Sequence, residues 1–408
     1  MEFYKNKSLT KIIPVIIASF IVHGTVLFVF CSIYVFVLML FKNNYKIYKK
    51  LDILPFLIIW GLGVVSSFVN FDDISFHEVL RFSFYVFTPI VSIILGYIIS
   101  RDDNKVSIYK TIFLCGSLIC FKYLYEIVIS LPGYGITLDL FRANKHNLSS
   151  LVVIALSIYI MSRINRQIII GEKIDKCLAA ICFFSVITSM SRYLIVALIV
   201  SISIILFENR RASRAFQYAL RIIVFVALVF LILYALPETR DLLKMGADKF
   251  LSSSSELSLN VTSWGEQEVN SSWRGYEMSC ALKQFISADF LSQLFGIGLR
   301  GVDVGRYASL VTDTSSTYLP LLHNGFLGIL IFSGIVGLFM YVGMILRNIK
   351  YASKKLMLDK NDINILAIII MAIVSISTFI VTGPISSIGI SFDMLVFGMV
   401  CAVRRSTL

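Results

Sequence analysis

Long apolar segments recur along the whole chain, and short clusters of Lys and Arg separate them. The segments 53–69, 81–99 and 109–131 are the first clear examples. Similar segments follow at 147–162, 217–236, 324–346, 363–381 and 388–403. About 20 mostly apolar helical residues cross a hydrocarbon core of about 30 Å. The pattern therefore predicts an all-α polytopic membrane protein.

Two apolar runs, 12–41 and 177–207, are too long for one simple span and carry basic residues on both flanks. Basic flanks belong on the same side of a membrane. We therefore predict that each run folds as a helical hairpin, the first turning near His23-Gly24 and the second at Ser189–Arg192. A single helix would bury Arg192 near the bilayer centre, at a cost of about 2.5 kcal/mol or more.

If each hairpin counts as two spans, the chain has about 12 predicted transmembrane helices, with both ends inside. Residues 1–236 hold helices one to nine, and residues 321–408 hold helices ten to twelve. Residues 237–320 form one large loop on the outer side between them. Every loop that this arrangement assigns to the inside is basic, which supports the count.

Composition narrows the possible functions. The chain is 57% hydrophobic and 15% charged, which leaves no room for a separate soluble domain. The net charge of +12 comes from basic residues in short loops, so we expect no nucleic-acid partner. The sequence contains no CxxC, paired Cys/His, Walker A or HExxH pattern, so it predicts no metal site and no cofactor. The apolar run after Lys11 has no cleavage site typical of a signal peptide.

The predicted loop 237–320 is too long for a passive connector. Its periodicity indicates an interfacial helix over 240–251, a flexible stretch over 252–260, and a helix that starts at Ser272 and ends before Gly296. Trp264 and Trp273 suit an interfacial position. The glycines at 296, 298 and 301 resemble a phosphate-binding loop, but no strand precedes them and no clear helix follows, so the nucleotide interpretation is disfavoured.

Two charged features need an explanation. Lys122 and Glu126 lie four residues apart in an apolar span and therefore share a helix face. They indicate either a functional site or a structural ion pair. The loop 132–146 is basic although it is predicted to lie outside, so Arg142 and His146 could contact a phosphate ligand or a lipid headgroup.

The junction at 318–337 is the strongest candidate for chemistry, because a polar loop ends there and an apolar run begins. His323 and Asn324 occupy the junction. A neutral His can take a proton from a hydroxyl near pH 7, and Arg side chains such as Arg192 and Arg274 bind phosphate through two hydrogen bonds. This combination suits displacement of a pyrophosphate without a metal. A lone His at a helix mouth is, however, more often a hydrogen-bonding or capping group.

The same residues resemble a known family. His323-Asn324, nine residues, Gly334, two residues and Gly337 match a His-(Asn/Ser/Gln)-x9-Gly-x2-Gly pattern. Ser191-Arg192 in an apolar hairpin and Arg274 at the start of a loop helix match two further features. The chain therefore resembles the O-antigen polymerase and O-antigen ligase superfamily of bacterial surface polysaccharide assembly. The resemblance is specific over 185–340. It departs from some polymerases, in which Gly follows the loop arginine by fifteen residues.

The resemblance implies a GT-C-like fold and an inverting, metal-independent glycosyltransferase of the bacterial inner membrane, with its active site facing the periplasm. The implied donor is an oligosaccharide on undecaprenyl pyrophosphate. Arg192 and Arg274 would hold the pyrophosphate, His323 would deprotonate or orient the acceptor hydroxyl, and Asn324 would orient the site. Further candidates for phosphate or sugar contacts are Arg81, Arg142, His146 and Arg300.

The acceptor decides the exact activity. A polymerase uses a second lipid-linked repeat unit, whereas a ligase uses the lipid A core. The motif at 323–337 does not separate them, and we favour the polymerase because such enzymes are diverse and common. Membrane lipids and a chain-length regulator are the other implied partners. A flippase for the same lipid-linked unit is the alternative of another class, although the chain lacks evident repeat halves.

Overall fold

The structure is a computed structural model, and it describes most of the chain. The described residues are 7–42, 52–69, 76–134, 140, 148–208, 264–310, 317–319, 321–359, 361–385 and 389–406. Three predicted segments lie outside them, namely the ninth span (217–236), the interfacial helix (240–251) and the flexible stretch (252–260).

Helices dominate the described residues, as the apolar pattern predicts. The helices of the apolar bundle are α1 (Lys7–Ile21), α2 (Gly24–Lys42), α3 (Leu54–Val69), α4 (Phe76–Ser100), α5 (Lys105–Tyr134), α7 (Leu151–Ile164), α8 (Glu172–Thr188), α9 (Arg192–Glu208), α16 (Gly325–Asp359), α17 (Asp362–Ile380) and α18 (Phe392–Ser406).

The predicted loop contributes shorter elements. They are α13 (Glu266–Ser271), α14 (Trp273–Ser287), α15 (Phe290–Phe295), β1 (Val302–Asp303), η5 (Gly305–Leu310) and β2 (Tyr318–Leu319). The two strands pair antiparallel, with Val302 opposite Leu319. The predicted loop helix from Ser272 is confirmed at its start as α14, but it breaks at residues 288–289, and a separate helix, α15, continues to Phe295 before Gly296.

Four described helices are long and apolar enough to cross a membrane, namely α4, α5, α16 and α17. The apolar helices α2, α3 and α7 are shorter. Together they support a polytopic membrane protein. The total of about 12 spans stays a prediction, as does the GT-C-like fold.

Both predicted hairpin breaks are confirmed. Helices α1 and α2 are separated at residues 22–23, and Gly24 has a φ of 62°. Helices α8 and α9 are separated at 189–191, where Met190 has a φ of 47°. Within each pair the two helices contact each other. Arg192 is therefore the first residue of α9 rather than a charge in the middle of a long helix.

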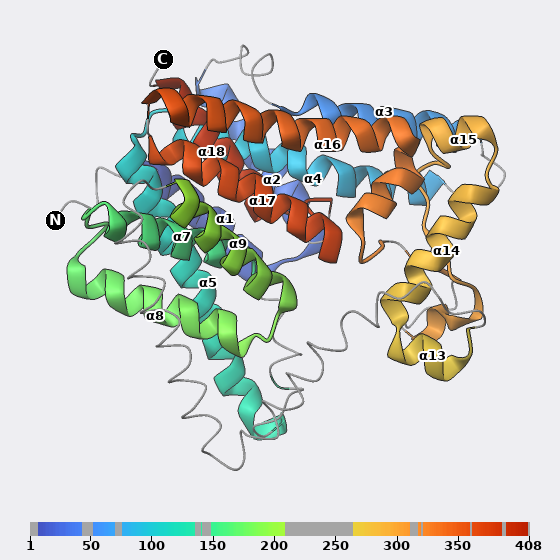
Figure 1. Cartoon of the computed structure of the whole chain (residues 1–408), viewed down its shortest axis with the longest axis horizontal. Helices are drawn as coiled ribbons and strands as arrows, with labels where there is room; N and C mark the ends of the chain where they lie inside the picture. The colour runs from blue at the N-terminus through green and yellow to red at the C-terminus, as the bar shows by residue number, and fades with distance from the viewer. Residues whose placement is uncertain are drawn as a thin grey trace.

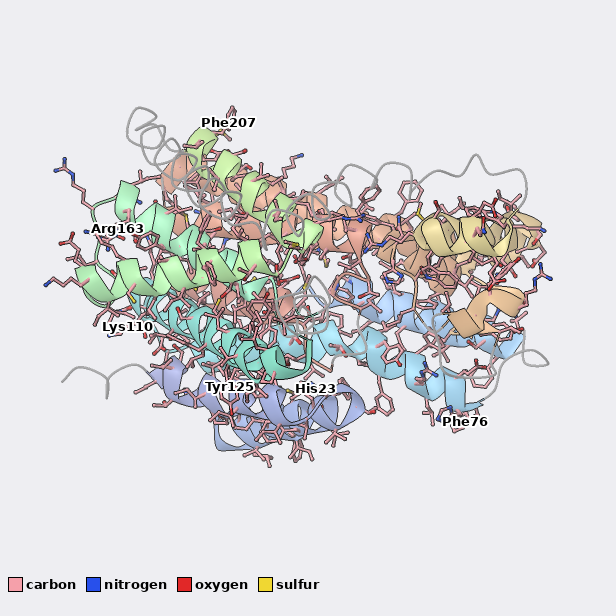
Figure 2. The ribbon with its side chains drawn as sticks, turned by 90° about the horizontal axis from the view of Figure 1, so that it is seen from below. His23, Phe76, Lys110, Tyr125, Arg163 and Phe207 are labelled. Carbon is pink, nitrogen blue, oxygen red and sulfur yellow. The ribbon has the colours of Figure 1, made fainter. Side chains whose placement is uncertain are left out.

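The bundle has two distinct ends. Helix α16 packs along α3 and α17, and α4 packs along α18. The elements α14 and α15 gather at the end where α16 begins (Figure 1). Arg163 and Phe76 lie near opposite ends of the long axis (Figure 2). We call the end that carries Lys105, Arg163 and Arg347 the basic end, and the end that carries α14 and the start of α16 the site end.

Helix α16 is kinked at Gly334, whose φ is 64° and ψ is −165°. The kink frees the carbonyl of Ile331, which accepts a hydrogen bond from the backbone N–H of Ile297 at 2.8 Å. A Cβ atom on Gly334 would lie 2.4 Å from the carbonyl of Leu294, so only glycine fits this close approach. The motif glycine therefore creates a docking place for the loop.

The segment 294–299, which we call the docking strip, fills this kink. Gly296 has a φ of 100°, and a Cβ atom there would lie 2.4 Å from the carbonyl oxygen of Phe332. The backbone N–H of Leu299 donates to the hydroxyl of Ser67 on α3 at 2.7 Å. The strip thus joins α14 and α15 to α16 and α3. Gly296 therefore serves close packing, and Gly298 supplies a backbone turn with a φ of 116°. These roles do not require a bound nucleotide.

Candidate active site

His323 and Asn324 immediately precede α16 at the site end. The side-chain oxygen of Asn324 accepts a hydrogen bond from the backbone N–H of Leu327 at 3.2 Å, which is the geometry of a helix N-cap. The backbone N–H of Gly325 donates to the carbonyl of Val381, at the end of α17, at 3.0 Å. These bonds fix the start of α16, and Asn324 is buried at 7% exposure. The observed role of Asn324 is therefore to cap α16.

His323 is held by a carboxylate from a distant part of the chain. Its ring Nδ1 lies 2.8 Å from Oε2 of Glu277, and its backbone N–H donates to Oε1 of the same residue at 2.5 Å. The side chain of Glu277 is 1% exposed, whereas that of His323 is 43% exposed. The carboxylate is therefore enclosed by protein, and the imidazole remains accessible.

Glu277 is the residue that sequence reasoning missed. It lies on α14, beside the predicted apolar stripe that includes Trp273, Tyr276 and Cys280. Glu277 and His323 are 46 residues apart in sequence, so no local pattern links them. The available signal was an acidic residue one helical turn after Arg274, in the same loop helix.

Arg274 reaches the site region through the same helix. It precedes Glu277 by three residues, which places the two side chains on neighbouring parts of one helix face. Its side chain is partly buried. The structure therefore brings one predicted arginine close, along α14, to the carboxylate that holds His323.

A small aromatic core holds α14 in place. Tyr276 contacts the rings of Trp264, Trp273 and Tyr307 at centroid distances of 5.3, 5.8 and 5.5 Å. Its hydroxyl donates to the carbonyl of Val304 at 2.6 Å. Burial raises the pKa of Tyr276, so the hydroxyl stays protonated and remains a donor. Both tryptophans, predicted to be interfacial, thus pack around the residue before Glu277.

Arg192 is on a different part of the bundle. It starts α9, as predicted, and its side chain is partly buried. Helix α9 packs against α17, and the end of α17 holds Gly325 at the start of α16. The neighbouring Tyr193 contacts the side chains of Ser150 and Ser377. Arg192 and His323 are therefore both on elements that are attached to α17.

The remaining predicted arginine and histidine candidates divide into two groups. Arg81 on α4 donates from Nε to the hydroxyl of Tyr85 at 2.9 Å, and the next residue, Phe82, contacts Phe332 beside the α16 kink at 5.2 Å. Arg300 directly follows the docking strip and is partly buried. Both are thus on segments that pack at the kink. Arg142 and His146 lie outside the described residues.

The intramembrane pair on α5 has a simple structural explanation. Nζ of Lys122 lies 3.4 Å from Oε1 of Glu126 and 5.0 Å from the ring centroid of Phe20 on α1. Both charged side chains are mostly buried, at 14% and 26% exposure. Of the two open interpretations, this geometry favours the structural ion pair.

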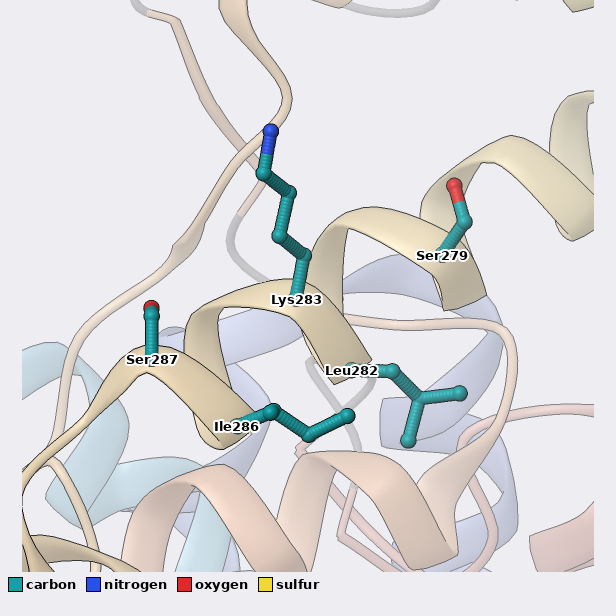
Figure 3. Close-up of a pocket in the computed structure, with 5 residues that line it drawn as sticks. All are labelled: Ser279, Leu282, Lys283, Ile286 and Ser287. Atoms are coloured by element: carbon teal, nitrogen blue, oxygen red, sulfur yellow. The ribbon is translucent and has the colours of Figure 1, made fainter. Parts of the chain in front are cut away.

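A shallow groove lies along the side of α14 that faces away from Glu277. Figure 3 shows Ser279 and Lys283 extending to one side of this helix and Leu282 and Ile286 to the other. At about 100° per residue, the groove residues point away from Glu277. The groove is therefore separate from the His323 site. In the part of the chain that the structure describes, no group of three or more His, Cys, Asp or Glu side chains could hold a metal ion.

Comparison with known proteins adds a family match. Residues 177–342 match a family model described as O-antigen ligase. The match contains Arg192, Arg274, Glu277 and His323, together with both motif glycines. No curated protein matches the chain. The predicted resemblance to the O-antigen ligase and polymerase superfamily is thus confirmed over residues 177–342.

Proposed function

We propose that this protein is a membrane glycosyltransferase that polymerises oligosaccharide repeat units from undecaprenyl-pyrophosphate donors at the periplasmic face of the inner membrane. One observation carries the proposal. An accessible imidazole, His323, is held by the buried carboxylate of Glu277 within the segment that matches the O-antigen ligase family. A held but accessible imidazole is what a general base needs.

The proposed reaction is a single displacement at the anomeric carbon of the donor. The acceptor hydroxyl oxygen forms the new bond to that carbon as the bond to the pyrophosphate oxygen breaks. The hydroxyl proton passes to Nε2 of His323, and the pyrophosphate leaves with the bonding electron pair. Attack from the face opposite the leaving group inverts the anomeric configuration. No metal takes part in this proposal.

Arg192 and Arg274 are proposed to bind the pyrophosphate. A guanidinium keeps its charge at any working pH and forms paired hydrogen bonds with phosphate oxygens. Such contacts strengthen as negative charge develops on the leaving group, which lowers the barrier to transfer. Arg274 is the better supported of the two, because α14 carries it one turn from Glu277. Arg81, Arg142, His146 and Arg300 remain weaker proposals for phosphate or sugar contacts.

The acceptor is tested with the purified full chain in lipid nanodiscs. Defined lipid-linked repeat units are supplied alone or together with lipid A core. Elongation without the core supports the polymerase. A product that forms only with the core supports the second candidate, the ligase, whose name the matching family model carries. Movement of the lipid-linked unit across a bilayer without any new glycosidic bond would instead support a flippase.

The base is tested by His323→Ala in the same assay. We expect transfer to fall by about 100-fold to 10,000-fold, the usual contribution of a positioned acid or base. Lys283→Ala is a matched control, because Lys283 is exposed on the groove side of α14. The unfolding temperature shows whether each variant folds. Full activity in folded His323→Ala would remove the proposed base.

A further inference from the structure

The Glu277–His323 contact can be interpreted more sharply than as a structural tie. Resting on the proposed function, we propose that Glu277 is a positioning residue that selects the tautomer of His323, keeping the proton on Nδ1 and leaving Nε2 free to accept one. The acceptor hydroxyl would then be the group that Nε2 deprotonates. Nothing in the sequence assigns Glu277 to the reaction.

The first argument is the use of both carboxylate oxygens. Oε1 accepts the backbone N–H of His323, and Oε2 lies at hydrogen-bond distance from Nδ1. An ionised carboxylate has no proton to donate, so Nδ1 must supply the proton of this bond. A neutral imidazole carries only one ring proton. Nε2 is then unprotonated and has a lone pair for the substrate.

The second argument is the double attachment of one residue. The bond to the backbone N–H fixes the position of the His323 backbone, and the bond to Nδ1 fixes the plane of its ring. Because Glu277 is 1% exposed, water competes little for either oxygen. The ring is thus already oriented before substrate arrives, which reduces the entropy cost of reaching the reactive geometry.

The third argument concerns charge during transfer. When Nε2 takes the hydroxyl proton, the imidazole becomes positively charged, and the carboxylate on Nδ1 stabilises that charge. A contact that only held the loop would not need an imidazole as the partner of the carboxylate. The exposed fraction of the His323 side chain, 43%, shows that the other side of the ring is not sealed by protein.

The proposal is tested with four variants of the full chain in nanodiscs. Glu277→Gln keeps the shape and one acceptor but removes the charge, and its amide can donate to Nδ1, which would stabilise the wrong tautomer. Glu277→Asp keeps the charge on a shorter side chain. Lys283→Ala is the control on the opposite face of α14. His323→Ala is measured beside them, so that loss of the base is separated from loss of its positioning.

We expect kcat of Glu277→Gln to fall about 100-fold or more, with a much smaller change in KM for the lipid-linked donor. Glu277→Asp should recover part of the lost kcat. Wild-type kcat in folded Glu277→Gln, with His323→Ala inactive, would overturn the positioning role and leave the proposed base intact. Full activity in His323→Ala would instead remove the base itself.

A spectroscopic measurement tests the tautomer without any activity. The chain has four histidines, so ¹⁵N labelling of histidine gives few signals, and His323→Ala assigns the one of interest. We expect the wild-type signal to show a protonated Nδ1 and an unprotonated Nε2, and this pattern to be lost in Glu277→Gln. A wild-type signal with the proton on Nε2 would overturn the proposal, even if Glu277→Gln fails to fold.

Discussion

Buried carboxylates at the two ends of the bundle have different partners. At the basic end, Asp175 accepts hydrogen bonds from the backbone N–H groups of Ile169 and Ile170, each at 3.0 Å, and lies 3.7 Å from Arg163. Its side chain is fully buried. These bonds fold the turn between α7 and α8. The carboxylate is thus occupied by backbone and by a permanently charged arginine.

At the site end, Glu277 is equally buried, but its side-chain partner is an accessible histidine. An arginine keeps its proton at any working pH, whereas a histidine can gain or lose one near neutral pH. A buried carboxylate that binds an arginine and backbone N–H groups therefore only fixes a turn. A buried carboxylate that binds an exposed imidazole can also determine which ring nitrogen carries the proton. The comparison predicts that substitutions at the basic end change stability, and that substitutions at Glu277 change catalysis.

The largest stability loss is expected for Asp175→Ala. Removing this carboxylate leaves a mostly buried Arg163, with a 13% exposed side chain, and backbone N–H groups without their acceptor. We expect a loss of about 3–5 kcal/mol in the free energy of unfolding, measured by denaturation in detergent. Activity per folded molecule should stay near wild type. Reduced activity with unchanged unfolding would contradict the division between the two ends.

The helical pattern could be predicted from the sequence because its causes are local. Apolar length and charged flanks gave the two hairpins, including Arg192 at the start of α9. His323 was found because it lies where a polar loop ends and an apolar run begins, and because its spacing to Gly334 and Gly337 matched a family pattern.

The features that the sequence did not predict depend on contacts between residues far apart in the chain. Glu277 can be recognised as a site residue only through its contact with His323, and no local sequence pattern links two residues that are 46 positions apart. Gly334 entered the sequence argument only through its spacing from His323. Its kink also needs the docking strip, 35–40 residues earlier in the chain, to supply the N–H of Ile297. Asn324 was expected to orient the chemistry, and its side chain is observed as a helix cap.

Gly334→Ala tests whether the kink holds the site end together. The added Cβ atom would lie 2.4 Å from Leu294 at a positive φ, so the kink must straighten or the docking strip must move. We expect at least about 2 kcal/mol of destabilisation, together with reduced transfer because α14 loses its anchor. Gly343→Ala is the matched control, because no atom lies within 4 Å of its added Cβ. Equal behaviour of the two variants would contradict this role.

A smaller effect is expected for Tyr276→Phe. The substitution keeps the ring contacts with Trp264, Trp273 and Tyr307 and removes only the hydrogen bond to Val304. We expect a loss of about 1 kcal/mol in local stability, visible as faster hydrogen exchange in α14. Because Glu277 follows directly, a modest fall in kcat should accompany it. Unchanged exchange in α14 would show that the aromatic core alone holds the helix.

The smallest effect is expected at the basic end, for Glu172→Gln. Glu172 and Lys176 form an ion pair at 2.8 Å, but both side chains are 60% exposed. The hydrogen bond from Lys176 lowers the pKa of Glu172. A lowered folded-state pKa adds stability above the unfolded pKa, and this stability is lost as the pH falls through the folded value. The variant should therefore unfold at a slightly lower temperature than wild type at pH 7, and at the same temperature once the pH is well below about 4. A difference that persists in acid would mean that Glu172 stabilises the turn without its charge, unlike Asp175, which accepts the backbone bonds there.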